Sequence, residues 1–277
     1  MLVFECENLV LGWNVRERRK GAAQGPAASA GSNQAQYFVF QSFPMVDFAA
    51  FEGCLPIVGR TGVGKSTLLY AMSGLALPVG GRIGWSLPAA EAPIIWDANG
   101  PKPEEDPRPL QFGFLLQDAE MVPCFTVREN LDHALALRGK RENAKDRTER
   151  IRRTVDLMKA KGEKLDELLD KYPSQLSGGM RKRMALAVAI AHDPVVLFAD
   201  EPTGSLDKET SITILQRIHG WLDADGAKGR RAFVCVTHNE DWLKEGLAAG
   251  AAFRVSAAET AGMGANTSRC TVTRIDL

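Results

Sequence analysis

Residues 55–67 read LPIVGRTGVGKST, an apolar run followed by a glycine-rich turn that ends in Lys-Ser-Thr. The turn fits the pattern G-x-x-x-x-G-K-[ST] with Gly59, Gly64, Lys65 and Ser66. The apolar run predicts a strand, and the residues after the turn predict a helix. Glycines in such a turn let backbone N–H groups point inward around phosphate oxygens, and the helix N-terminus adds a positive dipole. The stretch therefore predicts a phosphate-binding loop in an α/β fold.

The side chains of this loop have chemistry that suits a nucleotide. Lys65 would supply positive charge to the β- and γ-phosphates, and the Ser66 hydroxyl would bind Mg²⁺. We expect nucleotide contacts from the whole turn, namely Gly59, Arg60, Thr61, Gly62, Val63, Gly64, Lys65, Ser66 and Thr67. A phosphate loop occurs in GTPases, kinases, helicases and transport ATPases alike, and the sequence has no NKxD-like motif for reading guanine. The choice among these classes rests on other motifs.

Two such motifs lie downstream of the phosphate loop. Residues 172–179 read YPSQLSGG, and residues 195–207 read VVLFADEPTGSLD. In the second, Asp200 ends an apolar run that is typical of a buried parallel strand, and Glu201 follows it directly. In this order the motifs closely resemble those of the ABC (ATP-binding cassette) ATPase family, and the resemblance runs from about residue 38 to residue 238.

The resemblance implies a role for each of several residues. Asp200 would hold Mg²⁺ through water, and Glu201 would be the general base or would position the attacking water. His238, in the stretch VTHN, would contact the γ-phosphate. Gln117, in FGFLLQD, would lie near the metal and the attacking water. Phosphoryl transfer needs charge neutralisation and water positioning. The expected catalytic residues are therefore Glu201, His238, Lys65 and Gln117, and the expected metal-binding residues are Ser66, Gln117 and Asp200.

Ser177, Gly178 and Gly179 precede a predicted helix that starts near Met180, and they form a second helix N-terminus with exposed N–H groups. Met180 stands where the family commonly has Gln. In the family this segment acts in trans on ATP held by a partner subunit, so the resemblance implies a second ATP-binding subunit and, most simply, a homodimer. It also implies a D-loop made of Ser205, Leu206 and Asp207, with Asp207 in the nucleotide site.

The aromatic residue that stacks on adenine is left open between two positions. The family places it just after the first strand, where Trp13 stands in LVLGWN. A Trp ring stacks well, but Tyr37 is a competitor beyond the insertion that follows, and Trp13 could instead cover a sheet edge.

For the fold, the resemblance implies one ABC ATPase domain over residues 1–277. Residues 1–118 and 193–277 would form a RecA-like P-loop core with an antiparallel β subdomain, and residues 119–192 an inserted α-helical signature subdomain. Residues 17–36 contain no large apolar side chain and predict a flexible insertion. Residues 85–110 hold six prolines and several acids and predict a surface loop.

The composition limits the kinds of partner and the location that we expect for this chain. Lys and Arg number 34 against 34 Asp and Glu, so the basic excess typical of nucleic-acid binders is missing and no nucleic acid is expected. The apolar runs are too short to span a bilayer, and the first residues lack the basic region of a signal peptide. Five cysteines without CxxC spacing predict free thiols. These features predict a soluble, cytoplasmic chain, and the resemblance implies that it lies peripherally at the cytoplasmic face of the inner membrane.

Residues 199–207, ADEPTGSLD, and residues 119–131, AEMVPCFTVRENL, resemble one branch of the family especially, that of lipoprotein release, macrolide export and bacterial cell division. This implies an ATP-hydrolysing subunit, with ATP and Mg²⁺ as cofactors, that energises a membrane transporter through separate integral membrane subunits. An alternative is the ATPase of a mechanotransducing complex that transports nothing and regulates an extracytoplasmic enzyme. A third is a soluble ABC protein on ribosomes or DNA. Met121, Val122, Phe125 and Leu131 are candidates for a membrane-subunit groove or for internal core.

Overall fold

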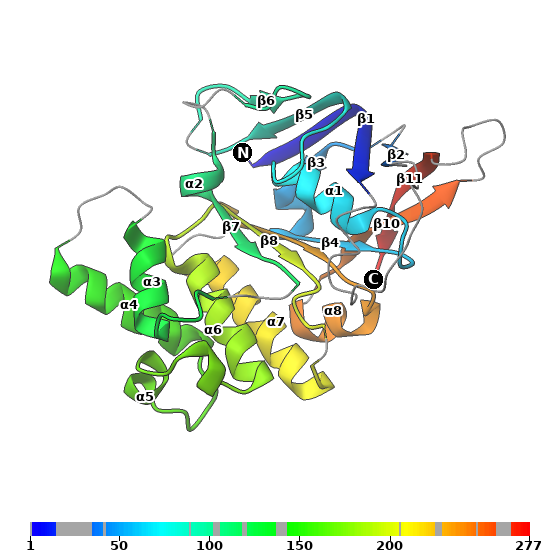
Figure 1. The fold of residues 1–277 in the computed structure, drawn as a ribbon. Helices are drawn as coiled ribbons and strands as arrows, with labels where there is room; N and C mark the ends of the chain where they lie inside the picture. Colours follow the sequence, from blue (N-terminus) through cyan, green and yellow to red (C-terminus); the bar gives the residue numbers. More distant parts are fainter. Residues whose placement is uncertain are drawn as a thin grey trace, which may run out of the picture.

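A computed structural model describes residues 2–14, 35–40, 43–88, 90–101, 106–117, 121–136, 143–204, 206–224, 229–247, 249–258 and 267–277. These residues fold as mixed α/β around one curled sheet (Figure 1). Its strand order is β6-β5-β1-β2-β11-β10-β4-β9-β8-β7, and β3 pairs with β1 outside this path. The predicted α/β class is confirmed.

One half of the sheet is parallel and carries the motifs. It contains β10 (Ala251–Ala258), β4 (Cys54–Val58), β9 (Ala232–Val236), β8 (Val196–Asp200) and β7 (Phe112–Leu115). The three central strands are buried along their whole length, because helices and the curled part of the sheet cover both faces. The sequence order places a helix after each of them, namely α1 (Lys65–Met72), α7 (Lys208–Asp223) and α8 (Glu240–Leu247).

The other half is largely antiparallel. It contains β1 (Val3–Asn14), β2 (Ala35–Phe40), β3 (Val46–Asp47), β5 (Gly80–Ser86), β6 (Ile94–Trp96) and β11 (Thr267–Asp276), with the short 3₁₀ helix η2 (Phe48–Phe51). β11 joins the halves, because it runs antiparallel to β10 and parallel to β2. The curl brings α1 against both halves (Figure 1). Leu68 and Met72 of α1 therefore share one core with Phe4 of β1 and Ile57 of β4.

The prediction of a surface loop over residues 85–110 is wrong for its first part. Ile94 and Trp96 form β6, which pairs with β5, and their exposed fractions are only 7% and 1%. The Trp85 indole N–H donates to the carbonyl of Met72 at 2.8 Å, so the region packs onto the end of α1. Prolines flank the strand without interrupting its ladder. The helix α2 (Arg108–Gln111) follows before β7.

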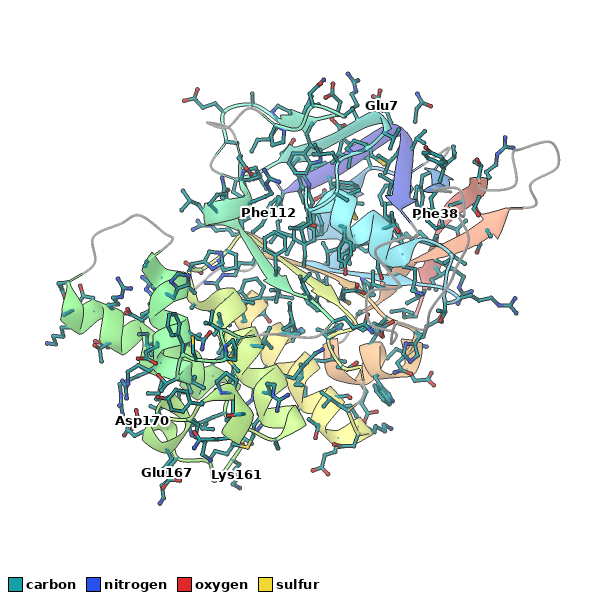
Figure 2. All side chains as sticks on the ribbon, viewed as in Figure 1. Glu7, Phe38, Phe112, Lys161, Glu167 and Asp170 are labelled. Atoms are coloured by element: carbon teal, nitrogen blue, oxygen red, sulfur yellow. The ribbon has the colours of Figure 1, made fainter. Side chains whose placement is uncertain are left out.

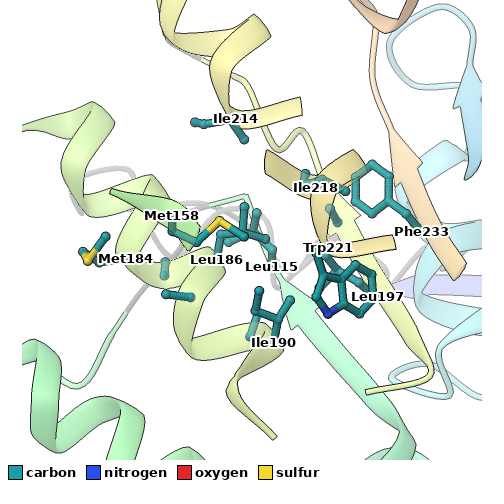
Figure 3. Packing of buried hydrophobic residues seen from close by; sticks show 14 of the residues in the cluster. Leu115, Met158, Met184, Leu186, Ile190, Leu197, Ile214, Ile218, Trp221 and Phe233 are labelled. Carbon is teal, nitrogen blue, oxygen red and sulfur yellow. The ribbon is translucent and has the colours of Figure 1, made fainter. Parts of the chain in front are cut away.

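Five further helical segments follow β7 and lie on the other side of the sheet from α1 (Figure 1). They are α3 (Val127–Ala136), α4 (Ala144–Met158), α5 (Leu165–Leu169), the 3₁₀ helix η4 (Pro173–Gln175) and α6 (Gly178–Ala191). Met158 of α4, Leu186 of α6 and Ile218 of α7 belong to a second core together with Leu197 of β8 (Figure 3). α6 is buried on most sides because α3, α4 and β7 all contact it.

Of the predicted insertion at residues 17–36, only Ala35 and Gln36 are described, as the start of β2, and the rest lies outside the described residues. Within the described ranges, no helix has the length and apolar content that crossing a bilayer requires.

Candidate active site

The glycine-rich turn joins β4 to α1 as the sequence predicts. Gly59, Gly62 and Gly64 all have positive φ, at 147°, 86° and 94°. A Cβ on Gly64 would lie 2.8 Å from the Phe38 ring, whereas one on Gly62 would meet nothing within 4 Å. Phe38 lies beside the start of α1 (Figure 2). Gly64 is therefore required both by backbone conformation and by space, and Gly62 by conformation alone.

Lys65 closes the turn on itself. Its ammonium donates to the carbonyls of Gly59 at 2.9 Å and Arg60 at 3.0 Å, and only 7% of the residue is exposed. Burial lowers the pKa of Lys65, while the carboxylates of Glu201 and Asp200 oppose that shift. An ammonium carries three N–H donors, so a lysine held in this way keeps capacity for an anion in the turn.

Asp200 ends β8 and faces α1. One carboxylate oxygen, Oδ1, accepts a hydrogen bond from Ser66 Oγ at 3.0 Å, and the other, Oδ2, accepts one from Tyr70 Oη at 2.9 Å. The residue is 2% exposed. Together with Gln117, these oxygens fit a hard cation such as Mg²⁺, which takes few protein ligands and keeps several waters. The described residues hold no cluster of three His, Cys, Asp or Glu.

Glu201 follows Asp200 in a strained conformation with φ of 51°, fixed by a hydrogen bond from its N–H to the carbonyl of Val236 at 2.9 Å. His238 Nδ1 lies 3.1 Å from Glu201 Oε1. The other oxygen, Oε2, is buried without a hydrogen-bond partner among the described residues. Such an oxygen is costly to leave unmatched, so it marks a place where a water or ligand group belongs.

These side chains line one cleft of about 630 Å³. Its walls are Phe38, Thr61, Gly62, Gly64, Lys65, Ser66, Thr67, Tyr70, Gln117, Asp200, Glu201, Gly204, Val236 and His238. Gly59, Arg60 and Val63 line an adjoining hollow that shares Thr61 and His238 with it. The structure thus brings together the predicted phosphate-loop, metal and catalytic residues, although they come from four distant stretches of the chain.

The predicted signature residues are elsewhere. Ser177 caps α6 by accepting a hydrogen bond from the N–H of Met180 at 3.3 Å, and neither it nor Gly178 or Gly179 lines the cleft. Asp207 caps α7 in the same manner. Its carboxylate accepts from the N–H and hydroxyl of Thr210 at 2.9 and 2.7 Å, which lowers the pKa of Asp207. Ser205 lies outside the described residues.

Trp13 and Tyr37, the two candidates for stacking on adenine, both lie on strands of the sheet. Trp13 pairs with Gln36 across β1 and β2, and its side chain lies outside what the structure describes. Tyr37 is 36% exposed, and its ring lies over Gly12, where an added Cβ would be 3.2 Å away. Both residues thus stand on the neighbouring strands β1 and β2.

Sequence reasoning missed four residues of the cleft, namely Phe38, Tyr70, Gly204 and Val236. Tyr70 carried a signal, because it stands four residues after Ser66 and so shares a face of α1 with it. Phe38 carried none, since only the curl of the sheet brings β2 to the phosphate loop.

The chain is similar to a known family. The family model described as "ABC transporter" matches residues 47–204. The chain is 36% identical over 189 residues to the ABC transporter ATP-binding protein YtrE of Bacillus subtilis, covering 67% of this chain and 73% of that protein. It is 35% identical over 196 residues to the lipoprotein-releasing system ATP-binding protein LolD of Legionella pneumophila, covering 70% and 79%.

Solved structures share the fold. Two dimeric structures of the ABC transporter cassette MJ0796, one of them a post-hydrolysis state bound to ADP and Pi, superpose with TM-scores of 0.65 and 0.64 at 21% and 22% identity. Each comparison covers 92% of this chain and 94% of the other. The predicted cassette fold is therefore confirmed over most of the chain.

Proposed function

The chain belongs to the ABC transporter family and is an ATP hydrolase, and on this premise we propose that it energises a membrane transporter through separate integral membrane subunits. The observation that carries the proposal is the cleft in which Lys65, Asp200, Glu201 and His238 converge on the phosphate loop. This arrangement suits hydrolysis of a bound nucleotide, and the relatives named above are ATP-binding proteins of transport and release systems.

In the proposed site the phosphate loop binds the triphosphate. Its inward N–H groups and the N-terminus of α1 supply partial positive charge, and Lys65 supplies a full one. The two hydrogen bonds from Lys65 to Gly59 and Arg60 hold the loop in its binding conformation before nucleotide arrives. A loop organised in advance avoids an ordering cost during binding.

Ser66 and Asp200, with Gln117 at the same cleft, would hold Mg²⁺. When bound there, the ion would neutralise charge on the β- and γ-phosphates. The contribution of the chain is to present the Ser66 hydroxyl and to hold Asp200 ready for metal-bound water. Both side chains are already oriented by their mutual hydrogen bond.

Glu201 and His238 act on the water and the γ-phosphate. The buried, unmatched Oε2 of Glu201 is a suitable acceptor for the proton of an attacking water. His238, 3.1 Å from Oε1, orients this carboxylate and can turn toward the γ-phosphate, because 59% of its side chain is exposed. The pair therefore links the position of the water to the presence of the phosphate.

We further propose a two-fold dimer with composite sites. Ser177, Gly178 and Gly179 do not line the cleft of their own chain, yet they form a helix N-terminus suited to an anion. A second copy could bring this terminus, and Asp207 beside it, to the open side of the cleft. In this arrangement residues 119–192 act as a helical subdomain that carries the signature, and the chain works at the cytoplasmic face of the membrane.

Purification of the tagged chain from detergent-solubilised membranes tests the proposal. We expect integral membrane subunits to co-purify and to raise the ATPase rate, and the reconstituted complex to move a substrate across vesicles. Recovery of the chain on ribosomes, without integral partners, would contradict it. A complex that hydrolyses ATP, moves nothing and activates an extracytoplasmic enzyme would replace transport by mechanotransduction. Lys65→Ala is the matched inactive control, since it removes the charge that binds phosphate.

A further inference from the structure

The carboxylate of Asp200 accepts hydrogen bonds from two hydroxyl groups of one helix, α1. Ser66 Oγ donates to Oδ1 at 3.0 Å and Tyr70 Oη donates to Oδ2 at 2.9 Å. Ser66 and Tyr70 are four residues apart on α1, so they lie on the same face one turn apart. Both oxygens of the carboxylate are therefore used, each by a different donor, and the group is 2% exposed.

The second hydrogen bond restricts the first. A carboxylate held on one oxygen alone can still rotate about its Cβ–Cγ bond, whose torsional preference is broad. A donor on each oxygen removes that freedom. Hydrogen bonds from a hydroxyl to an ionised carboxylate are also among the stronger ones in proteins. Tyr70 thus fixes the direction in which Asp200 Oδ1 meets the Ser66 hydroxyl.

We infer that Tyr70 is a positioning residue for the metal site formed by Ser66 and Asp200, and this inference rests on the function proposed above. By holding Oδ2, Tyr70 keeps Oδ1 as the acceptor of the Ser66 proton. The lone pairs of Ser66 Oγ are then left to face a divalent cation. Tyr70 lines the same cleft, so its hydroxyl lies within the site although its contact is with Asp200 rather than with substrate.

The ring of Tyr70 has a separate, structural part that a test must leave intact. It packs against the apolar core shared by α1 and the antiparallel strands. Its backbone carbonyl accepts hydrogen bonds from Ser73 Oγ at 3.1 Å and from the N–H of Ala76 at 3.0 Å. Tyr70→Phe keeps the ring and the backbone and removes only the hydroxyl that reaches Asp200.

The experiment compares nucleotide affinity with and without metal for wild type, Tyr70→Phe and Tyr172→Phe. A fluorescent ATP analogue is titrated in EDTA and then at fixed low Mg²⁺, and Mn²⁺ binding to the ATP complex is followed by electron paramagnetic resonance. For Tyr70→Phe we expect unchanged affinity in EDTA but Mn²⁺ affinity reduced about 10-fold, the lower end for residues that support a metal ligand. Tyr172 is exposed and does not line the cleft, so Tyr172→Phe should match wild type.

The ratio of the affinities with and without metal decides the outcome for each variant. A wild-type ratio in Tyr70→Phe would overturn the inference, whether or not the variant is less stable, because any loss of folded protein affects both measurements alike. If wild type itself binds ATP without any gain from metal, the proposed function fails instead. A reduced ratio confined to Tyr70→Phe supports the positioning role.

Discussion

The ammonium of Lys182 donates a hydrogen bond to the backbone carbonyl of Gln117 at 2.9 Å. Lys182 belongs to α6, the helix that begins at the signature residues, and Gln117 follows β7 at the edge of the cleft. Only 7% of Lys182 is exposed, so its ammonium needs hydrogen-bond acceptors from the protein itself. The contact ties α6, which begins at the signature residues, to the segment that carries Gln117 in the same chain.

Replacing Lys182 by Met keeps the apolar stem and removes the donor. We expect the free energy of unfolding to fall by about 1–3 kcal/mol, because the Gln117 carbonyl loses its partner. Turnover should fall more than nucleotide affinity, since Gln117 is displaced while the phosphate loop is untouched. Urea unfolding and steady-state kinetics measure both. Lys164→Met, at a site whose side chain is 77% exposed, is the control and should change neither.

Two of the three glycines of the phosphate loop, Gly62 and Gly64, give a second prediction. Alanine at Gly62 should destabilise the protein by about 1–2 kcal/mol, the cost of a left-handed conformation with a Cβ. Alanine at Gly64 adds a clash with the Phe38 ring at 2.8 Å, which raises the loss by a further ~1–3 kcal/mol. Thermal unfolding without nucleotide compares the two. Equal losses would mean that Phe38 moves away freely.

The sequence was sufficient to predict those parts of the site that depend on short-range pattern. The phosphate loop needs only β4, the turn and α1, which are contiguous, and Asp200 is marked by the apolar strand before it. His238 and Gln117 were assigned by resemblance, and the structure brings both to the same cleft, while their roles stay predictions.

Contacts between segments far apart in the chain could not be predicted from the sequence. The hydrogen bond from Tyr70 to Asp200 joins residues 130 positions apart and depends on how α1 rests on β8. Trp96 was predicted to lie in a surface loop because prolines surround it, yet pairing with β5 buries it. The spacing of Ser66 and Tyr70 places them on one face of α1, but nothing in that segment predicts that the face meets Asp200. The pairing of Trp96 with β5 leaves no signal in its own segment. Residues 208–223, which form α7, likewise gain their place from contacts with α8 and β9.

The cysteines should differ sharply in reactivity. Burial raises the pKa of Cys6 to about 12 and that of Cys270 to about 11, and it raises the pKa values of Cys54 and Cys235 as well. A raised pKa means less thiolate at pH 8, and the thiolate is the nucleophile. Cys124 is exposed. We expect iodoacetamide to modify Cys124 alone in the folded protein and all five thiols in denaturant, as read by mass spectrometry.

A Cys124→Ser variant is the control, and its folded form should take up no label. Rapid modification of Cys270 in the native protein would show that β11 opens away from the phosphate loop, whose Val63 carbonyl the Cys270 thiol contacts at 3.4 Å.

The segment after Gln117 contains both buried and more exposed apolar residues. Met121 and Leu131, both proposed for a membrane-subunit groove, are 6% and 0% exposed and belong to the helical core. Val122 is 38% exposed, and Phe125 is half-buried. The buried Asn130 side chain accepts from the N–H of Val122 at 2.7 Å and donates to the Phe125 carbonyl at 3.1 Å, so it fixes the loop that presents them.

Phe125→Glu should therefore detach the protein from membranes while its basal ATPase rate and Tm stay near wild type. A charge at Met121 should instead lower Tm strongly, because it would be buried without a partner. Co-sedimentation with membranes and thermal unfolding read the two effects. Membrane attachment that survives Phe125→Glu would place the docking surface elsewhere.

The last prediction concerns the dimer. Glu201→Gln keeps size and hydrogen bonding but removes the charge that accepts a proton from water, so hydrolysis should fall by about 100-fold or more. ATP should still bind, because Lys65 and the loop are intact, and the closed dimer should accumulate. Light scattering after gel filtration should then show a monomer without nucleotide and a dimer with ATP and Mg²⁺.

Ser177→Arg added to Glu201→Gln distinguishes the composite site from other modes of association. Ser177 is exposed at the start of α6 and does not line the cleft of its own chain, so a monomer has room for an arginine there. In the proposed dimer the same position packs over the γ-phosphate bound by the second subunit, where an arginine would not fit. The loss of the Ser177 cap costs only about 1 kcal/mol, too little to unfold the chain. Ser174→Arg places the same charge on an exposed position three residues earlier and should leave the dimer intact. If the doubly substituted protein still dimerises with ATP, the signature does not complete the partner's site. If Glu201→Gln alone stays monomeric at saturating ATP, even with its membrane subunits supplied, no nucleotide sandwich forms.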